Sequence, residues 1–348
     1  MGPSRTRPLP NALAAAGLLA LLVVACGGGE PRPAGETGTP DRPATDAGTA
    51  QAGEGEQGEL IELRVGFLPI AGYAYLWQAQ DAGYFEDEGL DVELVTAPGG
   101  AAIIPALQAG SMDLGVSEIV AVLNAQDAGI DARFVSFNFY ESEEAPTHAV
   151  VTNDPSVRTP ADLVDQRVAT NVLLNLDWLL VREWLRLHDV DPESVSYTEV
   201  PFPDQIGALD TGSIPAAGMI EPFYTIAESQ GMTVLGNYFT EVRPIVPTAG
   251  VIATQAYIDE HPDVVRRFVA AVERALQDGI EDESLVRDLI VEHTPTPPEV
   301  AEEINLQEWR LAADIEGIQF IIDLAEAEDL FDTEFTPEDI LWSEAKRE

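Results

Sequence analysis

Residues able to do catalytic chemistry are few, and their spacing matches no catalytic motif. Lys346 is the only lysine and follows no Gly-rich loop, so the chain has no Walker A phosphate-binding motif. Ser117 stands in no G-x-S-x-G nucleophile elbow. The four histidines lack metal-ligand spacing, which favours surface histidines over a metal site: His148, His188, His261 and His293. The sequence therefore predicts a binding protein without metal or cofactor, and no enzyme.

The charge balance excludes several further classes of protein. The 348 residues include 61 Asp+Glu and 18 Lys+Arg, for a formal net charge of −43. Nucleic-acid binding requires clustered basic residues, which this chain lacks. A hydrophobic content of 45% argues against disorder throughout, and one cysteine cannot form an intrachain disulfide. An acidic globular protein of one large or two medium domains remains.

The acidity has two interpretations at this stage. A charge this negative repels itself unless salt screens it, so a salt-rich habitat is one hypothesis. The other is an acidic, solubilising surface in a protein that uses Arg as its basic residue, since 17 of the 18 basic residues are Arg. Constant stability from low to high salt would contradict the first hypothesis.

The N-terminus has the features of an exported lipoprotein. Arg5 and Arg7 precede a short apolar stretch at residues 12–24, as in a signal peptide. Residues 23–27, Val-Val-Ala-Cys-Gly, resemble a bacterial lipobox, which implies cleavage after residue 25 and lipidation of Cys26. An ordinary signal peptide followed by a free thiol is the alternative.

The segment 26–60 is rich in Gly, Pro and acids and has no aromatic residue, so we expect a disordered tether. Of the charged residues, 54 acidic and 14 basic ones lie at 61–348, which leaves −40 on the folded part. The acidity therefore belongs to the folded part.

Short apolar runs alternate with amphipathic stretches along residues 61–348. In the first half, strands are predicted at 63–67, 90–95, 113–116 and 132–137, and helices at 75–82, 100–109 and 119–128. The alternation begins again near 147, with strands at 149–151, 162–169, 195–200, 216–220, 233–235 and 248–253 and a helix at 173–187. Helices follow at 262–277, 285–293, 298–304 and 314–327. Two α/β units with a helical tail predict two lobes around a cleft, with ligands beyond the carboxyl ends of strands.

Several motifs together are similar to those of a known protein family. Residues 79–94 contain A-x-x-x-G-Y-F and E-G-L-D-V-E-L, and residues 106–115 read A-L-Q-A-G-S-M-D-L-G. Residues 159–169 and 208–222 continue the pattern with T-P-A-D-L, R-V-A, A-L-x-x-G and M-I-E-P. The set, across roughly residues 62–280, resembles the solute-binding proteins of ABC importers in the nitrate/sulfonate/taurine and thiamine-precursor group. Residues 215–218 and 173–176 depart from the family pattern at positions that often bind ligand.

The resemblance implies an α/β fold of the type II periplasmic-binding-protein kind, with two lobes that are each an open mixed sheet flanked by helices. With the N-terminal pattern this gives four parts: a signal peptide at 1–25, the lipidated Cys26 and tether at 26–60, lobe 1 at 61–147 plus 250–348, and lobe 2 at 148–249. The C-terminal helices belong to lobe 1. Hinge crossings are expected near 146–149 and 247–251.

The resemblance also implies which residues bind ligand, because they follow predicted strands or begin predicted helices. In lobe 1 they are Tyr73, Ala74, Tyr75, Pro98, Gly99, Gly100, Ser117, Glu118 and Asn138. In lobe 2 they are Thr170, Asn171, Asp177, Trp178, Phe202, Glu221 and Phe223. For each of these residues, packing, capping or an ordinary turn is the structural alternative.

The chemistry of this set favours one class of ligand. It contains aromatic, amide, hydroxyl and acidic groups, with no Arg or Lys to pair with a buried anion. A neutral or cationic aromatic heterocycle, such as a thiamine pyrimidine precursor or a flavin-like vitamin, is therefore expected to stack on the aromatic side chains. An aliphatic sulfonate, taurine or nitrate is the alternative.

The family resemblance also implies the partners. They are a membrane permease and a separate ATPase; the binding protein itself is expected to be a monomer, outside the cell and held at the membrane by the lipid on Cys26. A sensory binding module and a biosynthetic enzyme of the same fold are the rival functions. The enzyme is disfavoured because the pyrimidine-making members carry a Cys-rich motif that this chain lacks.

Overall fold

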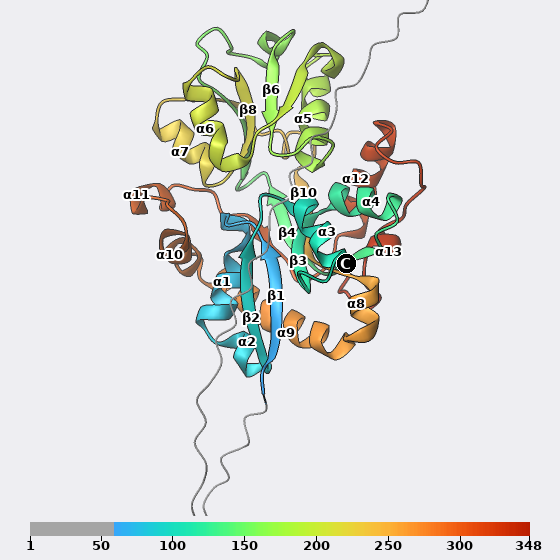
Figure 1. Ribbon diagram of the computed structural model, residues 1–348. Helices are drawn as coiled ribbons and strands as arrows, with labels where there is room; N and C mark the ends of the chain where they lie inside the picture. The colour runs from blue at the N-terminus through green and yellow to red at the C-terminus, as the bar shows by residue number, and fades with distance from the viewer. Residues whose placement is uncertain (1–58) are drawn as a thin grey trace, which may run out of the picture. The chain divides into compact units, whose positions relative to one another are not determined.

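The computed structural model describes residues 59–348, which contain two β-sheets with helices around them (Figure 1). The predicted signal peptide, Cys26 and nearly all of the predicted tether lie outside the described residues. No helix within 59–348 is both long and apolar enough to cross a membrane.

The larger sheet has six strands in the order β11-β4-β10-β3-β1-β2. β1 (Ile61–Phe67) pairs in parallel with β2 (Leu90–Thr96) and β3 (Leu114–Glu118). β10 (Ile245–Thr254) is antiparallel to β3 and β4 (Ala132–Ser142), and β11 (Glu308–Trp309) extends the edge at β4. The sheet is therefore mixed, and its parallel strands end on the side where the cavity described below is found.

The smaller sheet has five strands in the order β7-β6-β8-β5-β9. β6 (Arg167–Thr170) pairs in parallel with β7 (Ser196–Glu199) and β8 (Ala216–Ile220). β5 (His148–Thr152) is antiparallel to β8 and to β9 (Thr233–Gly236). The chain passes from the larger sheet to the smaller one between residues 142 and 148 and returns between 236 and 245.

The helices cover both sheets (Figure 1). Those around the larger sheet are α1 (Ala74–Asp81), α2 (Tyr84–Asp87), α3 (Gly100–Gln108), α4 (Ile119–Asp127), α8 (Gln255–Glu260), α9 (Pro262–Glu281), α10 (Glu283–His293), α12 (Ile315–Ala327) and α13 (Pro337–Ile340). Those around the smaller sheet are α5 (Leu176–Leu187), α6 (Phe202–Asp210) and α7 (Phe223–Ser229), with α11 (Pro298–Ala301) packed near α7. The predicted fold class, two open mixed sheets flanked by helices, is confirmed.

Local sequence explains several of these elements. Gly83, with φ +73°, provides the left-handed residue after α1. At Gly115 a Cβ would meet Ile103 Cγ2 at 2.3 Å, so this glycine lets α3 lie close against β3. In α9, buried residues recur every three or four positions, and Phe268 stacks on Phe85 with ring centroids 5.2 Å apart.

Several predicted boundaries are wrong: β4 runs to Ser142 and not 137, β10 begins at Ile245 and not 248, and α11 ends at Ala301 and not 304. The start of α5 has a clear cause. The helix predicted from residue 173 begins at Leu176, because the Asn175 side chain accepts a hydrogen bond from Trp178 N (3.0 Å) and caps it. Leu174 before it has φ +58°. Helices α2, α6, α7, α8 and α13 and strand β11 were not predicted.

Candidate functional site

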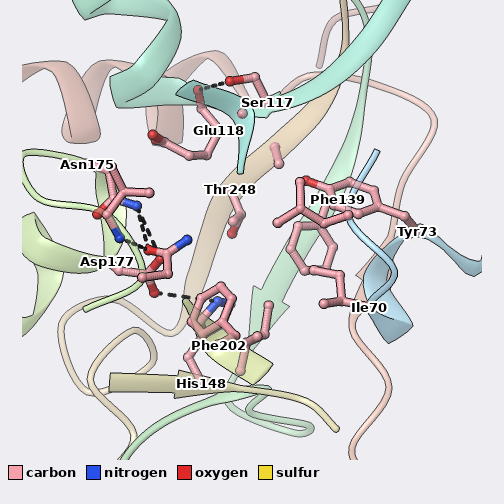
Figure 2. A pocket seen from close by; sticks show the side chains of 16 residues that line it. Ile70, Tyr73, Ser117, Glu118, Phe139, His148, Asn175, Asp177, Phe202 and Thr248 are labelled. Atoms are coloured by element: carbon pink, nitrogen blue, oxygen red, sulfur yellow. Dashed lines mark hydrogen bonds and ion pairs between the residues drawn. The ribbon is translucent and has the colours of Figure 1, made fainter. Parts of the chain in front are cut away.

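A cavity of about 50 Å³ lies between the two sheets, and both contribute to its walls (Figure 2). Residues of the larger sheet's side are Leu68, Ile70, Tyr73, Gly100, Ser117, Glu118, Phe139, Thr248 and Ala249. Those from the smaller sheet's side are His148, Asn171, Val172, Asn175, Asp177, Phe202 and Ile220. Many of them stand at or just after the ends of β1, β3, β6 and β8, where open α/β sheets bind ligands.

One wall of the cavity is aromatic and apolar. Tyr73 and Phe139 lie together with ring centroids 5.7 Å apart, beside Ile70 (Figure 2). Phe202, at the start of α6 on the smaller sheet's side, adds a third buried ring to the cavity lining. This wall provides the flat surfaces on which an aromatic ligand can stack.

Glu118 places a carboxylate at the cavity and at the start of α4. Its side chain caps the helix by accepting hydrogen bonds from Val120 N (2.7 Å) and Ala121 N (2.8 Å). Burial raises the pKa of Glu118 to about 8, even though these two N–H groups act in the opposite direction. The position combines a helix cap with a titratable group that lines the cavity.

His148 lines the cavity, and the carboxylate of Glu141 in β4 holds its imidazole in place. Its Nδ1 pairs with Glu141, whose Oε1 also accepts hydrogen bonds from Thr147 N and His148 N, both at 2.9 Å. The imidazole stacks on Phe239 with ring centroids 3.9 Å apart. Burial by itself would lower the pKa of His148, but the Glu141 carboxylate outweighs burial and the pKa is raised.

Asp177, in the first turn of α5, lies across from the aromatic wall (Figure 2). Its Oδ1 accepts a hydrogen bond from Tyr238 Oη (2.5 Å) and lies 3.9 Å from His148 Nε2. Asn175 Nδ2 donates to Asn171 Oδ1 (2.8 Å) and lies 3.4 Å from Asp177 Oδ2. Burial raises the pKa of Asp177. This wall therefore offers carboxylate and amide groups.

The structure brings together part of the predicted set. The cavity is lined by Tyr73, Gly100, Ser117, Glu118, Asn171, Asp177 and Phe202. The other predicted residues do not line it: Ala74, Tyr75, Pro98, Gly99, Asn138, Thr170, Trp178, Glu221 and Phe223. Whether any of these residues binds ligand stays a prediction.

Packing explains the positions of several predicted residues that do not line the cavity. Tyr75 is fully buried and meets Trp309 edge-on, with ring centroids 5.7 Å apart. The Arg182 guanidinium lies over Trp178, with Arg182 Cζ 4.6 Å from the centroid of the Trp178 ring. Glu221 is buried and accepts hydrogen bonds from Thr225 Oγ1 (2.7 Å) and Asn305 N (3.0 Å).

Sequence reasoning missed several cavity residues, including Phe139, His148, Asn175 and Thr248. The interpretation of His148 as a surface histidine is wrong, because its side chain is only 3% exposed and pairs with Glu141. His148 lies within the expected first crossing at 146–149. That position was the one signal in the sequence that it could lie next to the cavity. Among the described residues that line the cavity there is no Arg or Lys.

Comparison with known proteins identifies the family. Residues 71–284 match the NMT1/THI5-like family. An ABC transporter periplasmic binding protein of Brachyspira hyodysenteriae is 22% identical over 240 residues, which are 65% of this chain and 68% of that protein. The formylaminopyrimidine-binding protein of Halalkalibacterium halodurans is 25% identical over 247 residues, 68% of this chain and 72% of the relative.

Comparison with solved structures identifies the fold. The alkanesulfonate-binding protein SsuA from Xanthomonas axonopodis pv. citri superposes with a TM-score of 0.70 at 19% identity, over 82% of this chain and 99% of that one. This chain belongs to the NMT1/THI5-like family and has the type II fold of periplasmic binding proteins.

Proposed function

We propose that this chain is the solute-binding lipoprotein of an ABC importer and that it captures a neutral or cationic aromatic heterocycle between its two lobes. The observation that carries the proposal is the composition of the cavity wall: the rings of Tyr73, Phe139 and Phe202, two carboxylates, two amides, the imidazole of His148 and no Arg or Lys. A thiamine pyrimidine precursor or a flavin-like vitamin has the flat ring and polar edge that such a wall can recognise.

Electrostatics favour this class over an anion. Glu118 comes from the larger sheet's side and Asp177 from the smaller sheet's side, and a sulfonate or nitrate in the cavity would be repelled by either carboxylate when it is ionised. The N-termini of α4 and α5, which could attract an anion, are already capped by Glu118 and Asn175. A ligand N–H or cation, in contrast, finds acceptors on both sides.

Ligand entry requires the lobes to move. A volume of about 50 Å³ is far below the ~300–1,000 Å³ of pockets that hold drug-sized ligands. The two proposed lobes, one on each sheet, are joined by the crossings at residues 142–148 and 236–245, and bending there opens the cavity and closes it around ligand. The closed form then docks on the permease while a separate ATPase drives transport.

The cellular setting is part of the proposal. Residues 1–25 direct export, the lipid on Cys26 anchors the protein outside the membrane, and the segment to residue 60 tethers it as a monomer near its permease. The residue pattern around Cys26 supports the anchor, and the periplasmic relatives support the location.

A ligand panel tests the function. The melting temperature is measured with pyrimidines, flavins, taurine, an alkanesulfonate and nitrate, because binding raises it by mass action. We expect a heterocycle to stabilise the protein, Asp177→Asn to reduce that effect, and the exposed Asp204→Asn to leave it unchanged. Stabilisation by taurine, an alkanesulfonate or nitrate, with none by heterocycles, would overturn the ligand assignment. Stabilisation by none of these compounds would overturn the proposed function.

A further inference from the structure

Three potential metal ligands meet outside the cavity, where α1 and α10 end. Asp81 is the last residue of α1, and Glu292 and His293 are the last two of α10. One ligand atom from each of the three lies within 4.8 Å of the others. His293 Nε2 is 2.9 Å from Asp81 Oδ2. The separation of about 210 residues along the chain explains why histidine spacing alone predicts no metal site.

The imidazole of this cluster is held in position. Its ring stacks on the indole of Trp77, with centroids 4.9 Å apart and planes 9° from parallel. Trp77 is buried and stands four residues before Asp81, so both side chains lie on one face of α1. One helix thus orients the imidazole and also supplies a carboxylate next to it.

The surroundings favour a cation. In the ion pairs of residues 59–348, Asp81 has only His293 as a partner, and Glu292 has none. The C-terminal ends of two helices of eight and eleven residues meet here, and each carries the negative end of its dipole. No Arg or Lys therefore competes for these carboxylates within the described part of the chain.

We propose that Asp81, Glu292 and His293 bind a divalent transition-metal ion, with Zn²⁺ the best match. One imidazole nitrogen and two carboxylate oxygens are ligands that Zn²⁺ accepts, with water in the fourth position. The imidazole disfavours Mg²⁺ and Ca²⁺, which prefer oxygen ligands throughout. The bound ion would join α1 to α10, and its binding is independent of the solute in the cavity.

Calorimetry with ZnCl₂ on the chelator-treated full chain tests the site. We expect saturable binding of one ion, at least 10-fold weaker binding in Glu292→Gln, which keeps the Trp77–His293 stack, and loss of binding in His293→Ala. His261→Ala is the matched control, because that histidine is partly exposed and adjoins Glu260, with His261 Nε2 4.0 Å from Glu260 Oε2. A Cys26→Ser background shows whether the thiol contributes.

Fluorescence gives a second measurement. Ni²⁺ bound to an imidazole stacked on Trp77 should quench that indole, and Trp77→Phe should remove the saturable part of the quenching. Equal Zn²⁺ affinity in the parent chain and Glu292→Gln, or no saturable binding up to millimolar Zn²⁺, would overturn the site. Loss of the Zn²⁺ signal in the Cys26→Ser background would assign the ion to the thiol and would equally overturn it.

Discussion

The guanidinium of Arg182 lies 2.7 Å from the carboxylate of Glu328, although 146 residues separate them. Arg182 belongs to α5, beside the smaller sheet, and Glu328 follows α12, which packs on α4 and β10 of the larger sheet's side. Arg186 pairs with the other oxygen of Glu328. The Glu328 side chain is 7% exposed and that of Arg186 is 39% exposed, so a partly buried ion-pair cluster joins the two sides of the cavity.

Glu328→Gln should destabilise the closed arrangement. Removing this charge takes the shared partner from Arg182 and Arg186, which keep Glu193 and Glu183, so the cost should be below the roughly 3–5 kcal/mol of breaking a fully buried pair. We expect a lower free energy of unfolding and a larger radius of gyration by small-angle X-ray scattering. The exposed Glu326→Gln is the control and should change neither quantity. An unchanged radius would mean that the pair does not hold the lobes together.

Stability should fall as pH rises from mildly acidic to alkaline values. Burial raises the pKa of Glu118 to about 8 and that of Glu221 to about 7, whereas an unfolded glutamate titrates near 4.3. The folded state therefore binds protons more tightly, so this stability is complete below about pH 4.3 and is lost as pH rises through 7–8. Thermal melts from pH 5 to 9 should show the decline. Glu118→Gln should flatten it, and Glu302→Gln, at an exposed site, should not.

Phe202→Leu should weaken binding of an aromatic ligand while preserving most of the fold. Leucine keeps apolar volume at this buried position but cannot stack, and stacking is worth about 1 kcal/mol. The expected loss is roughly 5-fold in affinity, measured by calorimetry. Phe331→Leu, in a partly buried aromatic pair that does not line the cavity, is the control. An equal loss for an aliphatic ligand would argue against stacking.

Cys26→Ser should release the protein from the membrane. Without the thiol no diacylglyceryl group can be attached, and the short apolar stretch at 12–24 is too short to span the bilayer. Fractionation of the producing cells should find the parent chain with membranes and the variant in the soluble fraction. Intact mass spectrometry of the parent should show the lipid. A parent chain without the added mass would contradict the anchor.

The sequence alone determined the fold class, because the patterns that predict this class are local. Strand and helix periodicity, the glycines that end helices and the motif set around residues 79–115 each depend on a few neighbouring residues. The set of ligand-binding residues predicted from the sequence contained no Arg or Lys. The cavity lining has that composition among the described residues.

Tertiary structure decided which of the candidate side chains meet. Asp177 and Trp178 are adjacent in α5, yet one lines the cavity and the other lies beneath Arg182, because each residue turns the helix by about 100°. Nothing near His148 in the sequence shows that it stacks on Phe239, 91 positions later. The meeting of Asp81 with His293 likewise depends on how α1 and α10 pack. Burial and pairing of these groups come from long-range contacts, which local patterns do not encode.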